Sequence, residues 1–217
     1  MKNLLPPSHP QNVWRQQILN SQFSINMGHP LDRFRFCPVC GSSHWTEHNV
    51  KSKQCADCGF TYYANPSSAT AAFILRPSTH PLSLLPPHHS PLTSHPSMDL
   101  LVVRRGKEPA KGTLDLPGGF VDMDETAEEG IIREIQEETG LQVPSVEYLF
   151  SIPNLYMYSG MEIHTLDMFY RVYVEPDTEA HAADDAVDCQ WIPLADVHPK
   201  DFGLHSISQA VHRFLEK

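Results

Sequence analysis

The sequence predicts a protein of the α+β or α/β/α class, with a small cysteine-bearing unit in front of its main domain. Three observations support this prediction. Strand-like apolar segments outnumber helical ones, two segments have a helical period, and four of the five cysteines form two closely spaced pairs. The chain has 217 residues, a length that fits one domain plus a small appendage.

The first half of the chain alternates between segments that can fold regularly and segments that cannot. Residues 1–34 show no period and contain four prolines, so we expect a poorly ordered N-terminal tail. Residues 35–66 carry the paired cysteines in a compact unit. Strands are expected at residues 69–75 and 100–104. Between them, residues 77–98 are rich in Pro, Ser and His, which predicts a disordered insertion between two strands.

The second half contains both predicted helices. The first covers about residues 126–139 and stops at Gly140, a residue typical of helix C-termini. The second covers residues 206–216 and places its apolar side chains on one face. Three further strands are expected at residues 146–150, 163–174 and 187–192.

Composition excludes several classes of protein. No apolar run approaches the ~20 residues that span a bilayer, and the start lacks the apolar core of a secretory signal. We therefore expect a cytoplasmic protein with no membrane partner, whether translation begins at Met1 or at Met27. The formal net charge is −10, which argues against a protein built mainly to bind phosphate backbones.

The paired cysteines have the spacing of a metal site. Fourteen residues separate the pair Cys37 and Cys40 from the pair Cys55 and Cys58. Two CxxC pairs in a chain without an export signal predict a closed, tetrahedral and structural Zn2+ site, because four thiolates leave no position for water. Metal binding of about 10–16 kcal/mol can fold a unit this small.

The role of this zinc ribbon beyond structure stays open. Basic and aromatic residues lie close together in it, a combination that can bind single-stranded nucleic acid. We favour a structural appendage or a dimer surface, because so small a unit needs its aromatic residues as core. The residues concerned are Arg33, Arg35, Lys51, Lys53, Trp45, Phe60, Tyr62 and Tyr63.

An acidic helix carries the strongest chemical signal. On a helix, Glu134, Glu137 and Glu138 stand at positions i, i+3 and i+4, so their carboxylates project from one face. Like charges at this spacing repel, and a bound divalent cation would reverse that cost. Arg133 is placed to pair with Glu125 and fix the loop before the helix. Oxygen ligands select a hard cation, Mg2+ or Mn2+, bound together with substrate phosphates.

Residues 119–141 resemble the Nudix box, G-x5-E-x7-R-E-U-x-E-E-x-G-U, where U is a bulky apolar residue. Every fixed position is filled, by Gly119, Glu125, Arg133, Glu134, Ile135, Glu137, Glu138, Gly140 and Leu141. The resemblance covers about residues 67–217. It implies a Nudix domain there, with a mixed sheet between helices in an α/β/α sandwich, and Mg2+-dependent hydrolysis of a nucleoside diphosphate linked to another moiety.

The resemblance also implies roles for individual residues. Metal binding falls to Glu134, Glu137 and Glu138, with the Gly119 carbonyl as a further ligand, and Arg133 and Glu125 orient the site. The carboxylate that removes a proton from the attacking water differs among family members. It lies on the helix or on a later loop, where Asp184 and Asp185 are the candidates.

The substrate is less well defined by the sequence. A zinc ribbon before a Nudix domain is similar to the NADH pyrophosphatase subfamily, but residues 151–160 lack the SQPWPFP-type array that this subfamily carries, so we expect a different group. Tyr156 and Tyr158 could stack on a base or serve as ordinary packing. Of Arg104 and Arg105, strand alternation lets at most one face the site, where it would hold a phosphate or form a surface ion pair.

Two functional hypotheses follow. The first is a hydrolase that cleaves the diphosphate linkage of a small nucleotide such as ADP-ribose or NAD(H). The second is a catalytically weak regulatory module that senses a nucleotide and uses the zinc ribbon to bind nucleic acid or a partner. The filled motif favours the first, because a sensor need not keep all three carboxylates. We favour a small nucleotide over nucleic acid as the partner. A homodimer stays open, because dimers are common among members of the family.

Overall fold

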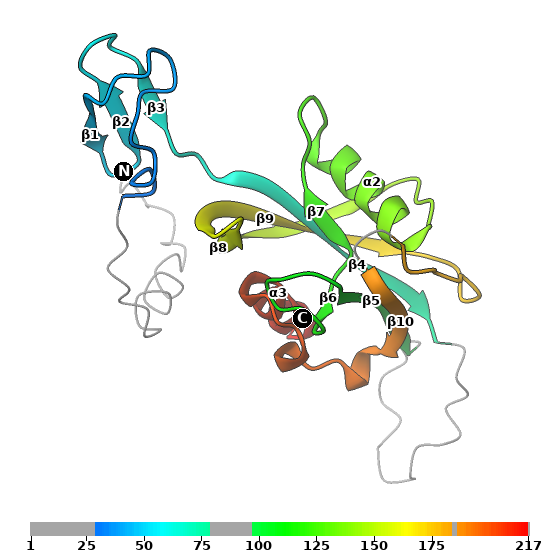
Figure 1. Ribbon diagram of the computed structural model, residues 1–217. Coiled ribbons are helices and arrows are strands. Elements are labelled where there is room, and N and C mark those ends of the chain that lie inside the picture. The colour runs from blue at the N-terminus through cyan, green and yellow to red at the C-terminus, as the bar shows by residue number, and fades with distance from the viewer. Residues whose placement is uncertain (1–28, 79–96, 184–185, 217) are drawn as a thin grey trace, which may run out of the picture. The chain divides into compact units, whose positions relative to one another are not determined.

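The chain divides into two compact units, Met1–Ala64 and Asn65–Lys217. The computed structural model describes residues 29–78, 97–183 and 186–216 (Figure 1). The predicted tail before residue 29 and most of the predicted insertion therefore lie outside the described residues. No helix in the described ranges is long and apolar enough to cross a membrane.

The first unit is a three-stranded antiparallel sheet. Its strands β1 (Trp45–Asn49), β2 (Ser52–Cys55) and β3 (Thr61–Tyr63) are joined in that order. Trp45 stacks on Phe60 with ring centroids 6.2 Å apart, and both pack against buried Cys37 and Cys55. The expectation that the aromatic residues form the core holds for this pair and is wrong for Tyr62 and Tyr63, which are exposed.

Residues 29–34 differ from the predicted tail. They form turns, and Leu31 is buried at 3% exposure. The His29 ring lies 2.8 Å from the Asn49 carbonyl oxygen, and the Lys53 ammonium lies 3.9 Å from Asp32. These contacts tie the segment to the ribbon, and they also bury Lys53, which removes one of the four bases from the surface.

The second unit is built on one mixed sheet. Its main strands are β4 (Ser67–Pro77), β5 (Met98–Arg105), β8 (Glu147–Tyr158), β9 (Met161–Tyr173) and β10 (Ala186–Pro193). They stand in the order β10-β5-β4-β9-β8. The pairing of β4 with β9 is parallel, and the other pairings are antiparallel.

Helices cover both faces of this sheet, α2 (Ala127–Thr139) on one and α3 (His205–Leu215) on the other (Figure 1). Strand β4 shows why, because it is apolar on both sides. Ala71, Phe73 and Leu75 pack under α3, whereas Ala72 and Ile74 pack under α2. The short 3-10 helices η2 (Leu194–Asp196) and η3 (Pro199–Asp201) connect β10 to α3. The predicted α/β/α sandwich with a mixed sheet is confirmed.

The centre of the sheet is forked. Strands β4 and β5 pair over only three residues each, 75–77 with 98–100, and then diverge. Two short strands fill the gap: β6 (Leu114–Asp115) pairs with β5, and β7 (Gly118–Phe120) pairs with β4. The sheet is therefore split where β4 and β5 diverge. The segment that carries β6 and β7, which precedes the acidic helix, lies in this split.

The elements expected from the sequence are present, with different ends. The longest discrepancy is β8, which continues to Tyr158 as one arm of a long hairpin with β9. Pro77 and Met98, the ends of the predicted insertion, pair with each other as strand residues. The two- and three-residue strands of the fork were not predicted.

Candidate functional site

Helix α2 is fixed at both ends by its own sequence. Thr126 is the N-cap, and its hydroxyl accepts a hydrogen bond from the Glu129 backbone N–H while the Glu129 carboxylate accepts one from the Thr126 backbone N–H. This capping box satisfies two otherwise free N–H groups. Gly140 closes the other end in the left-handed conformation at φ 70°. Between these caps, Ile131 and Ile135 are buried against the sheet, which turns the glutamate row toward the fork.

Two glycines let the chain of the fork pass close to β4 and to the acidic helix. Gly118 has φ 155°, and a Cβ there would lie 2.1 Å from the Thr70 carbonyl oxygen. A Cβ on Gly119 would lie 2.4 Å from a carboxylate oxygen of Glu134. In addition, the Gly118 N–H donates to Glu138 at 3.0 Å. Both glycines are therefore required for the turn to meet the helix.

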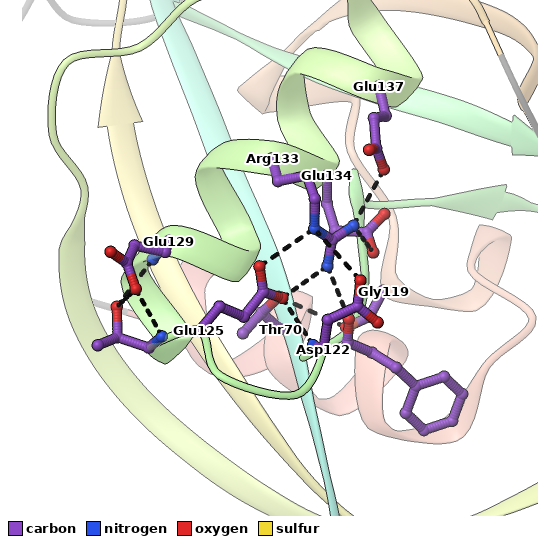
Figure 2. Close-up of polar contacts among 10 residues, drawn as sticks. Thr70, Gly119, Asp122, Glu125, Glu129, Arg133, Glu134 and Glu137 are labelled. Atoms are coloured by element: carbon purple, nitrogen blue, oxygen red, sulfur yellow. Dashed lines mark hydrogen bonds and ion pairs between the residues drawn. The ribbon is translucent and has the colours of Figure 1, made fainter.

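Arg133 holds the loop and the helix together (Figure 2). Its guanidinium donates to Glu125 at 2.7 and 3.2 Å and to the Phe120 carbonyl oxygen at 3.1 Å. It also donates to Glu134 at 2.9 Å and to Glu137 at 3.0 Å. The hydrogen bonds from Arg133 and the Asp122 backbone N–H lower the pKa of Glu125. The predicted pair of Arg133 and Glu125 is thus present, and the same arginine also bridges Glu134 and Glu137.

Negative charge in the site is incompletely neutralised. Burial raises the pKa of Glu138 to about 8, against the opposing Gly118 N–H and with help from the nearby charge of Asp115. Burial likewise raises the pKa of Glu134, although Arg133 opposes the rise. Burial also raises the pKa of Asp115, against its ion pair with Arg105. The pKa values of three carboxyl groups around the fork are therefore raised, and positive charge arriving in the site would favour their ionised forms.

This oxygen donor set fits a hard divalent cation. Glu134, Glu137, Glu138 and the Gly119 carbonyl offer oxygen atoms alone, the ligands that Mg2+ and Mn2+ prefer. Thr70 donates to the Gly119 carbonyl at 3.4 Å, which leaves that oxygen a second lone pair. The glutamates are not gathered into a closed cage, because Arg133 binds two of them.

These groups border one cavity of about 650 Å3. Its wall includes Glu134, Glu137 and Glu138 on the α2 side and Leu204, Ser206 and Ile207 from the α3 side. Residues from both helix layers therefore line the cavity. A volume of this size suits a small-molecule ligand.

Both predicted tyrosines border the cavity. Tyr156 and Tyr158 each meet the Phe120 ring edge to face, with centroids 5.8 and 5.9 Å apart. Arg104 and Arg105 also line the cavity, and that at most one of them faces the site stays a prediction.

The two arginines have different partners. Arg105 forms an ion pair with Asp115 and donates to the Tyr156 hydroxyl at 3.4 Å and to the Pro109 carbonyl at 2.8 Å. Arg104 donates to the Gly112 carbonyl oxygen at 2.7 Å. Arg105 is therefore a fixed part of the cavity wall, whereas Arg104 is bound only to a turn.

Sequence reasoning missed Asp115 and Asp167, which border the same cavity and are both buried. A signal was present in each case, because each acid interrupts an apolar stretch of the sequence. A charged residue in a buried strand calls for a partner or a function. Asp184 and Asp185 lie outside the described residues.

The four ribbon cysteines are gathered for a metal. All four sulfur atoms lie within 4.8 Å of one another, with Cys37 and Cys58 at 3.7 Å and Cys40 and Cys55 at 3.6 Å. Zn–S bonds of about 2.3 Å in a tetrahedron require S–S distances of about 3.8 Å, so the set fits zinc. Within the described ranges no other set of three or more such ligand atoms lies so close.

Comparisons with known proteins agree with this geometry. The chain is 26% identical over 176 residues to the NAD-capped RNA hydrolase NudC of Vibrio vulnificus, which covers 81% of this chain and 57% of that protein. It is 49% identical over 53 residues to the ADP-ribose pyrophosphatase of Methanocaldococcus jannaschii, covering 24% of this chain and 31% of that protein. The chain spans about half the length of the NudC relatives that it matches.

Solved structures show the same fold. A Nudix hydrolase from Nitrosomonas europaea aligns with a TM-score of 0.54 at 18% identity, covering 84% of this chain and 90% of that one. The Nudix domain of Shewanella oneidensis NrtR, solved with ADP ribose, aligns with a TM-score of 0.52 at 21% identity, covering 71% and 89%. The NUDIX domain profile matches residues 93–213, more than half of the chain. The chain therefore belongs to the Nudix family.

Proposed function

We propose that this protein is a Mg2+- or Mn2+-dependent hydrolase that cleaves the diphosphate linkage of a small nucleotide joined to another moiety. The observation that carries the proposal is the convergence of Glu134 and Glu138 on the Gly118–Gly119 turn at the edge of the cavity. The names of the relatives, NAD-capped RNA hydrolase and ADP-ribose pyrophosphatase, describe substrates with such a linkage and support the substrate class.

In this proposal, Glu134, Glu137, Glu138 and the Gly119 carbonyl hold the cation. When bound, the cation neutralises the diphosphate and makes an attacking water more acidic. Arg133 and Glu125 keep the loop against the helix, as their hydrogen bonds indicate. Arg105, held by Asp115, presents positive charge at the cavity wall and can bind a phosphate oxygen. The base that accepts the proton from water stays a prediction, on α2 or at Asp184 and Asp185.

The two units have separate roles in the proposal. Residues 67–217 form the hydrolase domain, and residues 35–66 form a zinc ribbon whose metal is structural, because four cysteines complete its shell. No catalytic group is required from the ribbon.

The test is a hydrolysis panel with product identification in the presence of Mg2+ or Mn2+. The panel contains ADP-ribose, NAD, NADH, dinucleoside polyphosphates, FAD, CoA and nucleoside triphosphates. We expect at least one compound to be cut at its diphosphate, and to lose cleavage in Glu137→Gln. Binding of nucleotides without hydrolysis of any member would instead favour the nucleotide-sensing regulatory module.

A further inference from the structure

The α3 side of the cavity carries a set of polar side chains that the diphosphate chemistry does not use. We name it the polar floor, and it consists of Asn154, Thr165, Asp167 and Ser206. The first comes from β8, the next two from β9 and the last from α3.

Strand register places the β8 and β9 members together. Asn154 stands opposite Thr165 in the β8–β9 pair, and Asp167 stands opposite Ala69 of β4. Thr165 and Asp167 share a face with Phe169, two residues further on, which packs in the core beneath α3. Ala69 and Ala71 of β4 also border the cavity, and their small side chains leave room above the strand.

The polar floor is buried and incompletely satisfied. Asp167 is 8% exposed, and its one recorded partner among the described residues is the Asn154 amide, which donates at 3.0 Å. Thr165 and Ser206 are 3% and 1% exposed, and neither hydroxyl has a hydrogen-bond partner in the described structure. Buried polar groups are normally paired, so unpaired hydroxyls on two residues that line the same cavity point to a ligand.

The chemistry of these groups restricts what the ligand presents. A carboxylate only accepts hydrogen bonds, so Asp167 requires N–H or O–H donors, while the hydroxyls can donate or accept. Asp115 lies close enough to Asp167 to interact with it electrostatically, so a second anionic group is disfavoured there. The fitting ligand part is neutral and rich in donors. In a nucleotide, an amino-bearing base edge and a ribose diol have this chemistry.

The polar floor is connected to the glutamates by the cavity itself. Asp115 interacts electrostatically with Glu138 on one side and with Asp167 on the other. A single nucleotide can therefore place its phosphates at the α2 side and its neutral end at the α3 side. Phe120, Tyr156 and Tyr158 border the same cavity and offer ring surface to a base.

We propose that the polar floor recognises the nucleoside part of the substrate, with Asp167 accepting hydrogen bonds from its neutral donors. This inference rests on the proposed function in that a nucleotide occupies the cavity. It assigns substrate specificity to β9 and α3 residues that lie outside the Nudix box.

The test compares the binding of four nucleotides to the unmodified full chain and to Asp167→Asn. Binding is measured by calorimetry, without hydrolysis. The ligands are AMP, GMP, purine riboside 5′-monophosphate, which lacks the amino group, and 2′,3′-dideoxy-AMP, which lacks the ribose diol. Asp167→Asn keeps an oxygen for the Asn154 amide but turns a donor toward the ligand. We expect about 10- to 100-fold weaker binding of the nucleotide that carries the recognised donor. For the analogue lacking that donor, binding to the variant and the unmodified protein should be about equal.

The pattern across ligands identifies the donor. Loss of the effect with purine riboside 5′-monophosphate assigns it to the base amino group, and loss with 2′,3′-dideoxy-AMP assigns it to the ribose diol. An equal weakening of all four ligands, or no weakening, would overturn the proposal, because Asp167 would then act on the fold or on nothing.

A second variant keeps the proposal testable if Asp167→Asn fails to fold. Thr165→Val preserves side-chain size and removes a buried hydroxyl that has no partner. A merely structural threonine would leave nucleotide binding unchanged, whereas we expect weaker binding together with equal or higher thermal stability. Binding is measured without turnover, so the two proposals fail separately. If no compound is hydrolysed but the effect of Asp167→Asn depends on the ligand as expected, only the proposed hydrolase is refuted. If a compound is hydrolysed but the effect of Asp167→Asn is the same for all ligands, only this inference is refuted.

Discussion

The thiol cluster of the ribbon and the acidic cluster of the Nudix unit are organised in opposite ways. In the ribbon, four sulfur atoms from two tight turns already lie within 4.8 Å of one another. In the Nudix unit, Arg133 bonds to both Glu134 and Glu137, and the third glutamate accepts from Gly118. The first cluster has the geometry of a closed site, and the second has its ligands bound to protein groups beside a cavity.

The difference teaches how ligand chemistry relates to role. A closed set of soft sulfur ligands stabilises structure, since nothing else can reach the metal. Carboxylates spread along a cavity can share a cation with a substrate, which is how Mg2+ is commonly bound. The following predictions test this contrast, beginning with the largest expected effect.

Removing a ribbon ligand should have the largest effect. Cys37→Ser is expected to release zinc and unfold the ribbon, with loss of much of the about 10–16 kcal/mol that zinc binding supplies to such units. Metal content by mass spectrometry under native conditions measures the release. Cys189→Ser is the matched control, because Cys189 is a free cysteine of β10 outside the cluster. One zinc retained per Cys37→Ser chain would contradict the four-cysteine site.

Removing one carboxylate charge from the cavity should stop turnover without unfolding the protein. For Glu137→Gln we expect a fall in hydrolysis rate of at least about 1000-fold, because cation binding supplies several kcal/mol to such reactions. Glu129→Gln is the control on the same helix, since glutamine also serves in a capping box. Weaker Mn2+ binding by electron paramagnetic resonance provides a readout independent of substrate. Unchanged activity in Glu137→Gln would refute the assignment.

The close approach at the fork predicts a stability effect. Gly118→Ala places a Cβ 2.1 Å from the Thr70 carbonyl oxygen at a positive φ, and we expect a loss of about 2–3 kcal/mol in the free energy of unfolding. Gly112 also has a positive φ, but a Cβ there would meet nothing within 4 Å. Gly112→Ala therefore measures the cost of a side chain at a positive φ without a steric overlap. Denaturant unfolding of the two variants measures the difference, and equal midpoints would exclude the close approach.

The smallest expected effect concerns acid. The pKa of Glu125 is lower in the folded chain, because Arg133 and the Asp122 N–H bind its charged form. The stabilisation is therefore present above the pKa of the unfolded chain, about 4.3, and is lost as pH falls through the lower folded value. Glu125→Gln should lower the melting temperature more at pH 6 than at pH 3, where the unmodified protein has lost part of this stabilisation. A constant difference across this range would show that the charge is not involved.

Local signals explain what could be predicted from the sequence. The helix at 126–139 was predicted because its apolar face and its stop signal, Gly140, lie within one segment, while its N-terminal capping box was not used. The pair of Arg133 and Glu125 was predicted from the motif, and their separation of eight residues is bridged by a single loop. The same reasoning gave the alternation of Tyr156 and Tyr158, which share the cavity side of β8.

Long-range packing explains what could not be predicted. Strands β6 and β7 are too short to show a period, and they exist because β4 and β5 diverge and offer them free edges. The burial of Asp115 and Asp167 depends on elements distant in sequence.

The fork in the sheet has a consequence for how such an enzyme can change over evolutionary time. Glutamates contributed by α2 and side chains contributed by β9 and α3 meet one cavity from opposite layers. In the proposed function, the reaction depends on α2 and recognition of the nucleoside depends on β9 and α3. Selection can then alter the preferred compound through β9 and α3 while the reaction is inherited on α2.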